Sequence, residues 1–211
     1  MKGRFLCLLL CAVLMIPLTC ACSRGGGYAE EAVVRDHYAG SEIADELCEM
    51  MRMLTVNSPI MPEFEGIGEA MEQCRDSVLY YMLTKNYGKY TGDIERLDAA
   101  VEEYPQMQIM SLIPAREFEE TVYKAFGGTR KISNESGRLF VYLERIAAYT
   151  SVTMLDADPI EVDVLSLAET ENTYRMRCRC SADEVTSPEY QVIFVKRDDG
   201  TAYFHSVEEV G

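Results

Sequence analysis

The sequence predicts an α+β protein in which an N-terminal helical layer is followed by a C-terminal antiparallel β-meander. Up to about residue 127, apolar residues recur at steps of three and four, which is the period of an amphipathic helix. After about residue 158, apolar and polar residues alternate, and short turn sequences separate the alternating runs. We therefore assign residues 29–127 to a helical region and residues 128–211 to a β region that packs on the helices within a single domain.

Four helices are expected in the helical region. The first follows Ser41, a favoured N-cap residue, and residues 29–38 are expected to precede it as a weaker helix. The second spans about residues 67–85, the third follows the N-cap Asp93, and the fourth begins at Pro114. The apolar stripes of the first two helices contain Ile43, Leu47, Met50, Met51, Leu54, Ile67, Met71, Cys74, Val78, Tyr81 and Met82.

The β region is ambiguous at its start and clear at its end. Residues 129–157 mix helical spacing with strand-forming residues, and we assign them to short pieces of strand. Four further strands are expected at residues 160–164, 174–180, 190–196 and 201–207. Polar turns join these strands, including a hairpin turn at residues 197–200, so they predict an antiparallel meander.

The strand at residues 174–180 is predicted to have one buried face and one charged face. Its three arginines alternate with apolar residues and therefore point to the polar side of the sheet. Glu161 and Asp163 lie on the polar face of the preceding strand. We expect a cross-strand charge ladder between these carboxylates and the arginines, rather than an anion-binding site.

The beginning of the chain resembles the signal of a bacterial lipoprotein. Two cations precede an apolar run at residues 5–18, which is shorter than the ~20 residues that span a bilayer. Ala21 then precedes Cys22, as in the lipoprotein family. The resemblance implies that residues 1–21 are a signal peptide and that Cys22 carries lipid. Thr19 stands where the family usually has leucine, so an ordinary cleaved signal and an uncleaved anchor remain alternatives.

This resemblance implies a protein that is anchored in the cell membrane through acyl chains on Cys22 and faces away from the cytoplasm. Residues 22–28 are rich in glycine and are expected to form a flexible tether. The chain carries a net charge of −15, which becomes −17 once the two leader cations are removed. So acidic a chain is not expected to bind nucleic acid, because that affinity depends on neutralising phosphates with Lys and Arg.

Four of the eight cysteines lie beyond the leader and Cys22. Cys48 and Cys74 stand on different predicted helices and could form a disulfide in an oxidising compartment. Cys178 and Cys180 are two residues apart on a strand, so they share one face and are not expected to bond to each other. We interpret this pair as buried free thiols. The cysteine spacing predicts no zinc site, and we expect no metal or cofactor.

Catalytic sequence signatures are absent from the chain, and no catalytic residue is assigned. Alternation places His205 on one face with Tyr203, and together with Tyr174 these residues form a tentative pocket beneath the sheet. His205 could act there as a base, since imidazole titrates near neutral pH. The sequence identifies no acid partner for it, so a structural histidine is preferred. His37 and Asp36 are adjacent in the expected weak helix and therefore point apart.

Two further resemblances concern shape. The segments 113–115 and 126–127, with the closing strands at 190–194 and 203–205, resemble a class of small bacterial lipoproteins, most of which have no assigned activity. The last third also resembles the sheet of the NTF2-like superfamily, in which a curved sheet wraps helices around a pocket. These resemblances imply an architecture and no particular function, because fold alone does not define activity.

Two functions therefore remain open. The first is a membrane-tethered, non-enzymatic binding or interaction domain whose protein or small-molecule ligand is unknown. The second is a small-ligand pocket with hydrolase- or isomerase-type activity through His205. The twelve methionines bear on both, because methionines on the helical stripes could fill the core or line a binding groove. A filled space between sheet and helices would count against the second function.

Overall fold

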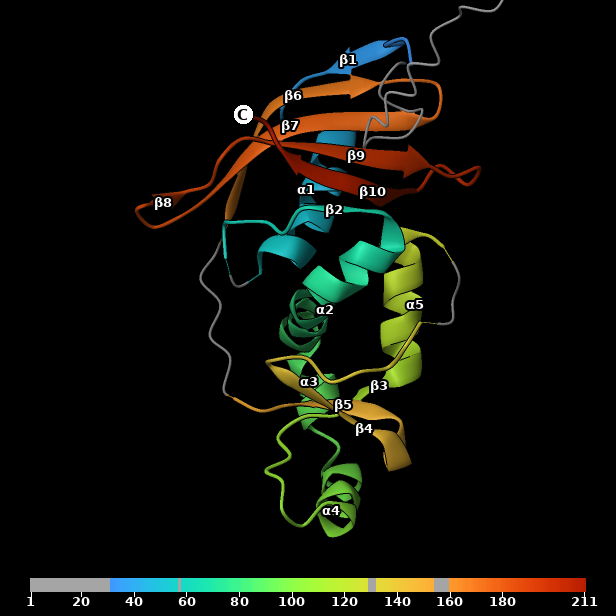
Figure 1. The fold of residues 1–211 in the computed structure, drawn as a ribbon, viewed down its shortest axis with the longest axis vertical. Helices are drawn as coiled ribbons and strands as arrows, with labels where there is room; N and C mark the ends of the chain where they lie inside the picture. Colours follow the sequence, from blue (N-terminus) through green and yellow to red (C-terminus); the bar gives the residue numbers. More distant parts are fainter. Residues whose placement is uncertain (1–30, 57, 129–131, 154–159) are drawn as a thin grey trace, which may run out of the picture.

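The structure is a computed structural model that describes residues 31–56, 58–128, 132–153 and 160–211. It is an α+β fold in which helices precede a largely antiparallel seven-stranded sheet, as the sequence predicts. Figure 1 shows an elongated molecule, with this sheet at one end, α2 and α5 in the middle and α4 at the other end. The predicted signal peptide, Cys22 and the tether at residues 22–28 lie outside the described residues.

Five α-helices form within the described residues. They are α1 (Glu42–Thr55), α2 (Gly66–Lys85), α3 (Tyr87–Thr91), α4 (Ile94–Glu103) and α5 (Ala115–Phe126). Two predicted caps are confirmed: the Ser41 hydroxyl accepts the Ala44 N–H at 3.4 Å, and the Asp93 carboxylate accepts the Arg96 N–H at 3.2 Å. Pro114 was expected to be the first helical residue, but it instead ends a strand and caps α5. The short helix α3 was not predicted.

The main sheet has the strand order β1-β6-β7-β9-β10-β2, and β8 pairs with β7 as a side hairpin. Its strands are β1 (Arg35–His37), β2 (Phe64–Glu65), β6 (Glu161–Glu169), β7 (Thr173–Ala182), β8 (Val185–Thr186), β9 (Tyr190–Lys196) and β10 (Ala202–Glu209). Successive antiparallel pairing of β6, β7, β9 and β10 confirms the predicted meander. The two edge strands come from the first half of the chain, within the region expected to be helical.

The weak helix expected at residues 29–38 is wrong for its described part. Residues 35–37 form β1 and pair antiparallel with residues 167–169 of β6. The physical reason is tertiary: pairing satisfies backbone groups along the edge of β6, and three residues gain more from this ladder than from an isolated helical turn. His37 therefore lies on a strand, and its neighbours differ from those that a helix would provide.

The predicted faces of β7 are confirmed, and the predicted charge ladder holds in register for one pair, since Asp163 lies opposite Arg179. Met176, Cys178 and Cys180 are buried, and Arg177 and Arg179 are exposed. Both arginines form ion pairs with Glu189, which directly precedes β9. Glu161 lies opposite Ser181, beyond the last arginine of β7.

A second, three-stranded sheet lies toward the α4 end of the molecule. Its order is β3-β5-β4, with β3 at Ile113–Pro114, β4 at Phe140–Leu143 and β5 at Ala148–Ser151. The short strands expected within residues 129–157 are thus confirmed at β4 and β5, which a turn of 3-10 helix at Glu144–Ile146 connects. Residues 129–131 and 154–159 lie outside the described residues.

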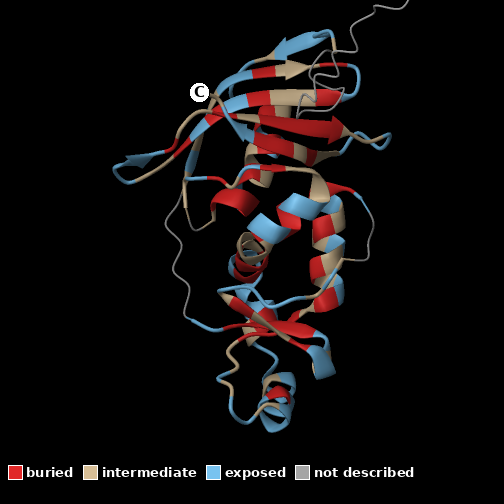
Figure 2. Ribbon diagram, in the orientation of Figure 1, coloured by how far each residue is buried: buried red, intermediate tan, exposed pale blue. Residues whose placement is uncertain are grey.

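The main core fills the space between the large sheet and the helices beneath it. Figure 2 shows buried residues along α2, α5, β9 and β10. Four aromatic rings meet here: Phe126 and Phe194 lie 5.5 and 4.9 Å from Phe204, and Phe64 lies 5.8 Å from Phe126, between ring centroids. Within the described part of the chain, no helix combines the length and the apolar character needed to cross a membrane.

Candidate functional site

Tyr174 and Tyr203, two residues of the predicted pocket, lie on different faces of the main sheet. In the strand register Tyr174 is opposite Phe194, which is in turn opposite the buried Phe204. Tyr203 is opposite Val195, one position along, and neighbouring positions on a strand point to opposite faces. The structure therefore does not bring these two tyrosines together in a pocket beneath the sheet.

His205, the third residue of the predicted pocket, lies at an irregularity in β10. Phe204 pairs with Phe194 and Ser206 pairs with Ile193, so the register skips His205, which is half-buried. A β-bulge redirects the side chain of its extra residue. The alternation that placed His205 beside Tyr203 does not hold across this bulge, and a regular strand pattern could not have revealed it.

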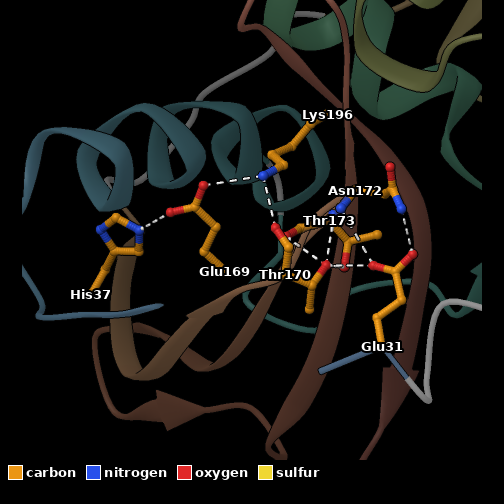
Figure 3. A network of polar contacts seen from close by, with 7 residues as sticks. All are labelled: Glu31, His37, Glu169, Thr170, Asn172, Thr173 and Lys196. Atoms are coloured by element: carbon orange, nitrogen blue, oxygen red, sulfur yellow. Dashed lines mark hydrogen bonds and ion pairs between the residues drawn. The ribbon is translucent and has the colours of Figure 1, made fainter. Parts of the chain in front are cut away.

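Tyr174 belongs instead to a cluster that we call the edge cluster: His37, Glu169, Tyr174 and Lys196. His37 Nε2 lies 2.9 Å from Glu169 Oε2, and Lys196 Nζ lies 3.1 Å from Glu169 Oε1 (Figure 3). Lys196 Nζ also stands 5.4 Å from the centroid of the Tyr174 ring, which is a cation–π distance. Strands β1, β6, β7 and β9 each contribute one of these side chains.

The electrostatics of the edge cluster favour a fixed carboxylate. The hydrogen bond from His37 and the nearby Lys196 ammonium hold the pKa of Glu169 below its ordinary value, against a smaller opposing effect of burial. Burial and the Glu169 charge raise the pKa of the Tyr174 phenol. A carboxylate held ionised between the His37 imidazole and the Lys196 ammonium is suited to holding the edge strand β1 in place, and it is a poor general acid.

Glu31 attaches the start of the described chain to the turn between β6 and β7. Its carboxylate accepts hydrogen bonds from the Thr170 hydroxyl at 2.5 Å and from the Asn172 side-chain amide at 2.8 Å (Figure 3). Its backbone carbonyl accepts a bond of 3.1 Å from the Arg175 guanidinium. Together with β1, these contacts hold the N-terminal segment at the sheet end of the molecule.

A groove that we call the hairpin groove lies between α1, α5 and the turn that joins β9 to β10. Its volume is about 630 Å³, which is within the range of small-molecule sites. Met50 and Met53 line it from α1, and Ala202 lines it from β10. Lys124 from α5 and Arg197 from the turn supply positive charge to the lining. These residues are distant in sequence, and only the fold brings them together.

Arg197 is held at the groove by neutral partners. Its guanidinium donates to the carbonyls of Tyr123 and Lys124, at 2.9 and 3.0 Å, and so caps the C-terminal end of α5. It also stacks on the rings of Tyr123 and Tyr203, with centroids 5.7 and 4.8 Å away. Tyr203, a predicted pocket residue, therefore lies beside this groove. Tyr203 is also the reason for Gly127, where a Cβ would lie 2.7 Å from its ring.

The charge of the groove is not balanced by ion pairs. Among the described residues, no carboxylate forms an ion pair with Lys124 or with Arg197. The other lysines that the structure describes, Lys85, Lys89 and Lys196, are all ion-paired. The absence of an ion pair at Lys124 is unexpected in a chain with 35 acidic and 20 basic residues, where carboxylates are abundant.

Sequence patterns missed most of this groove. Met50 was recognised on an apolar stripe for which core filling and a methionine-lined groove were both open, and it is half-buried in the groove lining. No sequence pattern indicated that Met53 or Lys124 would line a binding site. Arg197 was read only as part of a hairpin turn, and a turn sequence does not show which helix end the turn will reach.

All four cysteines that the structure describes are free thiols. The Cys48–Cys74 disulfide is therefore wrong for this structure, while the prediction of buried free thiols at Cys178 and Cys180 is confirmed. Burial raises the pKa of the Cys74 thiol to about 12, and burial also raises that of Cys48. Protonated thiols are poor nucleophiles. No group of three or more His, Cys, Asp or Glu side chains suited to a metal ion occurs in the described ranges.

Comparison with known proteins gave no match, whether to a family model, to a curated protein or to a solved structure. Besides the sequence, three features of the structure bear on function. These are the hairpin groove, the edge cluster and the attachment of the N-terminal segment.

Proposed function

We propose that the protein is a membrane-tethered, extracytoplasmic lipoprotein that acts as a non-enzymatic binding domain through the hairpin groove. The lipoprotein-like signal at residues 1–22 supports the tether. The observation that carries the binding function is the groove itself, which is about 630 Å³ in volume. Two cationic side chains, Lys124 and Arg197, line it without forming an ion pair to any described carboxylate. Among its described lining residues, the one carboxylate, Asp199, is hydrogen-bonded to Thr201, and no histidine or cysteine is present, which favours binding as the role of the groove.

The place where the N-terminal segment attaches supports a tethered orientation. Glu31 lies nine positions after Cys22, and an extended chain spans at most ~3.6 Å per residue, or roughly 30 Å here. Glu31 and β1 lie at the sheet end of the long axis, opposite α4 (Figure 1). A lipid anchor on Cys22 would therefore keep the sheet end near the bilayer and direct the α4 end away from it.

The NTF2-like resemblance is also part of this proposal. Four consecutive antiparallel strands with helices against one face support it. The rings of Phe64, Phe126 and Phe204 occupy the centre of the space between sheet and helices. The ligand would therefore bind at the margin of that space, in the hairpin groove, rather than beneath the middle of the sheet beside His205.

Mass spectrometry of the native membrane fraction tests the tether. We expect an N-terminal peptide that begins at Cys22 and carries diacylglycerol. Cys22→Ala should abolish the modified peptide, whereas the matched change Cys20→Ala, two residues earlier, should leave it intact. An N-terminus at any unmodified residue would contradict the lipoprotein assignment and leave the groove to be tested separately.

Native mass spectrometry of the purified protein tests binding in the groove. We expect small molecules to copurify with the wild type and to be lost from Ala202→Trp, because an indole at this position would fill part of the cavity. Val185→Trp, on the exposed β8, is the matched control and should retain them. Equal ligand occupancy in both variants would show that the hairpin groove is not the binding site.

A further inference from the structure

We infer that the ligand of the hairpin groove is an amphiphilic anion, a small molecule with an apolar chain and a carboxylate or phosphate head. This inference rests on the proposed binding function and specifies its ligand class. Three properties of the groove support this ligand class. The lining has an excess of positive charge, apolar side chains lie beside that charge, and the acid of the lining, Asp199, is already hydrogen-bonded to Thr201.

The positive charge of the groove comes from Lys124 and Arg197. Lys124 is exposed in the last turn of α5, and it is the only lysine of the described chain that lacks an ion pair. Among the residues that the structure describes, the Arg197 guanidinium donates to uncharged oxygens alone, those of Tyr123, Lys124, Thr201 and Ala202. These neutral acceptors leave the guanidinium charged, so it attracts an anion in the groove through its charge, part of which acts on Asp199.

Asp199 is the only carboxylate among the described residues of the lining, and it already accepts hydrogen bonds within its own turn. It accepts the Thr201 backbone N–H at 3.0 Å and the Thr201 hydroxyl at 2.6 Å. These hydrogen bonds, and to a smaller extent the Arg197 charge, lower the pKa of Asp199, so it is ionised at neutral pH. The lining therefore carries two positive charges and one negative charge, which leaves it positive on a strongly acidic protein.

The apolar part of the lining lies on the α1 and β10 sides of the cavity. Met50 and Met53 are one turn apart on α1, and Ala202 and Ala125 are small residues that leave room between the elements. Unbranched, polarisable methionine side chains adapt to chains of different shape. An alkyl chain against these residues would place its acidic head toward Lys124 and Arg197.

Titration calorimetry on the processed chain, residues 22–211, tests the ligand class. This chain contains every described residue and, without acyl chains, needs no detergent; a cooperative melt would first show that it folds. The probes are octanoate, octyl phosphate and octan-1-ol. We expect the two anions to bind at least about tenfold more tightly than the alcohol, and their affinity to fall as salt is added, because salt screens the charges.

Matched charge variants locate the anionic head. Lys124→Gln should weaken octanoate and octyl phosphate about fivefold, as for a charge pair open to solvent, without affecting octan-1-ol. Lys124→Arg should restore binding of both anions. Arg116→Gln removes one positive charge from the first turn of the same helix, outside the groove, and should change nothing. A preference for one of the two anions would distinguish a carboxylate from a phosphate head.

The outcomes separate the ligand class from the binding function. If octan-1-ol binds as tightly as octanoate and Ala202→Trp blocks both, the groove is a binding site but the anionic ligand is wrong. If Lys124→Gln and Arg116→Gln weaken the anions equally, the effect is one of net charge and the location is wrong. If none of the probes binds, the amphiphilic ligand is overturned, and the copurification experiment alone decides whether the groove binds anything.

Discussion

The two ends of the molecule are built on hydrophobic cores of very different size. At the sheet end, α1, α2 and α5 pack against a meander whose inner face carries large buried rings such as Phe194 and Phe204. At the other end, α4 packs on the small sheet through a separate cluster of buried residues. That cluster consists of Ala100, Leu112, Leu143 and Ala148. Because stability follows buried apolar area, the α4 end should open long before the rest of the protein unfolds.

The small sheet explains how so little core can hold a helix in place. One of its faces contributes Phe140 and Tyr149 to the main core, where the ring centroid of Tyr149 lies 5.1 Å from that of Phe118 on α5. Its other face receives α4. Polar contacts add to this face, since the Tyr104 hydroxyl accepts the Arg145 N–H at 2.9 Å. The α4 end is therefore an extension that depends on the main core, whereas the main core does not depend on α4.

The largest expected effect is at the centre of the main core. Phe204→Ala should lower the free energy of unfolding by about 3–5 kcal/mol, because it leaves a cavity among packed rings. Denaturant unfolding followed by circular dichroism measures this loss. Val185→Ala, on the exposed hairpin strand β8, is the control and should stay within about 0.5 kcal/mol. A loss below about 1 kcal/mol for Phe204→Ala would contradict the assignment of this core.

A smaller and more local effect is expected at the α4 end. Leu143→Ala should destabilise the small cluster by about 2 kcal/mol, the low end of the range for such changes, because the cluster borders solvent. Native-state hydrogen exchange should accelerate in α4 and β4 and stay unchanged in β7 and β9. Ile94→Ala, on α4 at the same end of the molecule but 61% exposed, is the control. Uniform acceleration across both sheets would show that the two ends unfold together.

The N-cap of α4 gives a finer test of the same difference. Asp93→Ala removes the acceptor of the Arg96 N–H and should cost about 1 kcal/mol. Asp93→Asn keeps a capping oxygen and should cost less. Exchange of α4 amides should report the loss, while the midpoint of global unfolding moves little. If the stability measured by α4 amide exchange and the stability measured by global unfolding fell equally, α4 would belong to the global cooperative unit.

The smallest effect concerns the edge cluster and depends on pH. The pKa of Glu169 is lowered in the folded protein, so its stabilising contribution is fully present above its unfolded value of about 4.5 and is lost as pH falls through the folded value. Glu169→Gln should therefore cost at most about 1 kcal/mol at pH 7, and less as the pH approaches 3. Unfolding curves at several pH values measure the loss of stability caused by Glu169→Gln. A loss that does not change with pH would contradict a stabilising role for the Glu169 charge.

The candidate site was less predictable from sequence than the fold. Tyr203 was singled out and lies beside the groove, where it stacks on Arg197. Tyr174 was also singled out, but its partners Glu169 and Lys196 could not be identified because they come from separate strands. His205 was placed by a regular alternation that a bulge interrupts. A pattern search detects repetition, and sites are often built where repetition stops.

By itself the sequence determined the helices α1, α2, α4 and α5 and the order of the meander. These elements are written in spacings between neighbouring residues, since each must bury one face of its own length. Only the tertiary structure decided the edge strand β1, the small sheet that separates two cores, and the groove that joins α1, α5 and a hairpin turn. These features arise from pairing and packing between residues far apart in the chain, and no local pattern encodes which distant surfaces will meet.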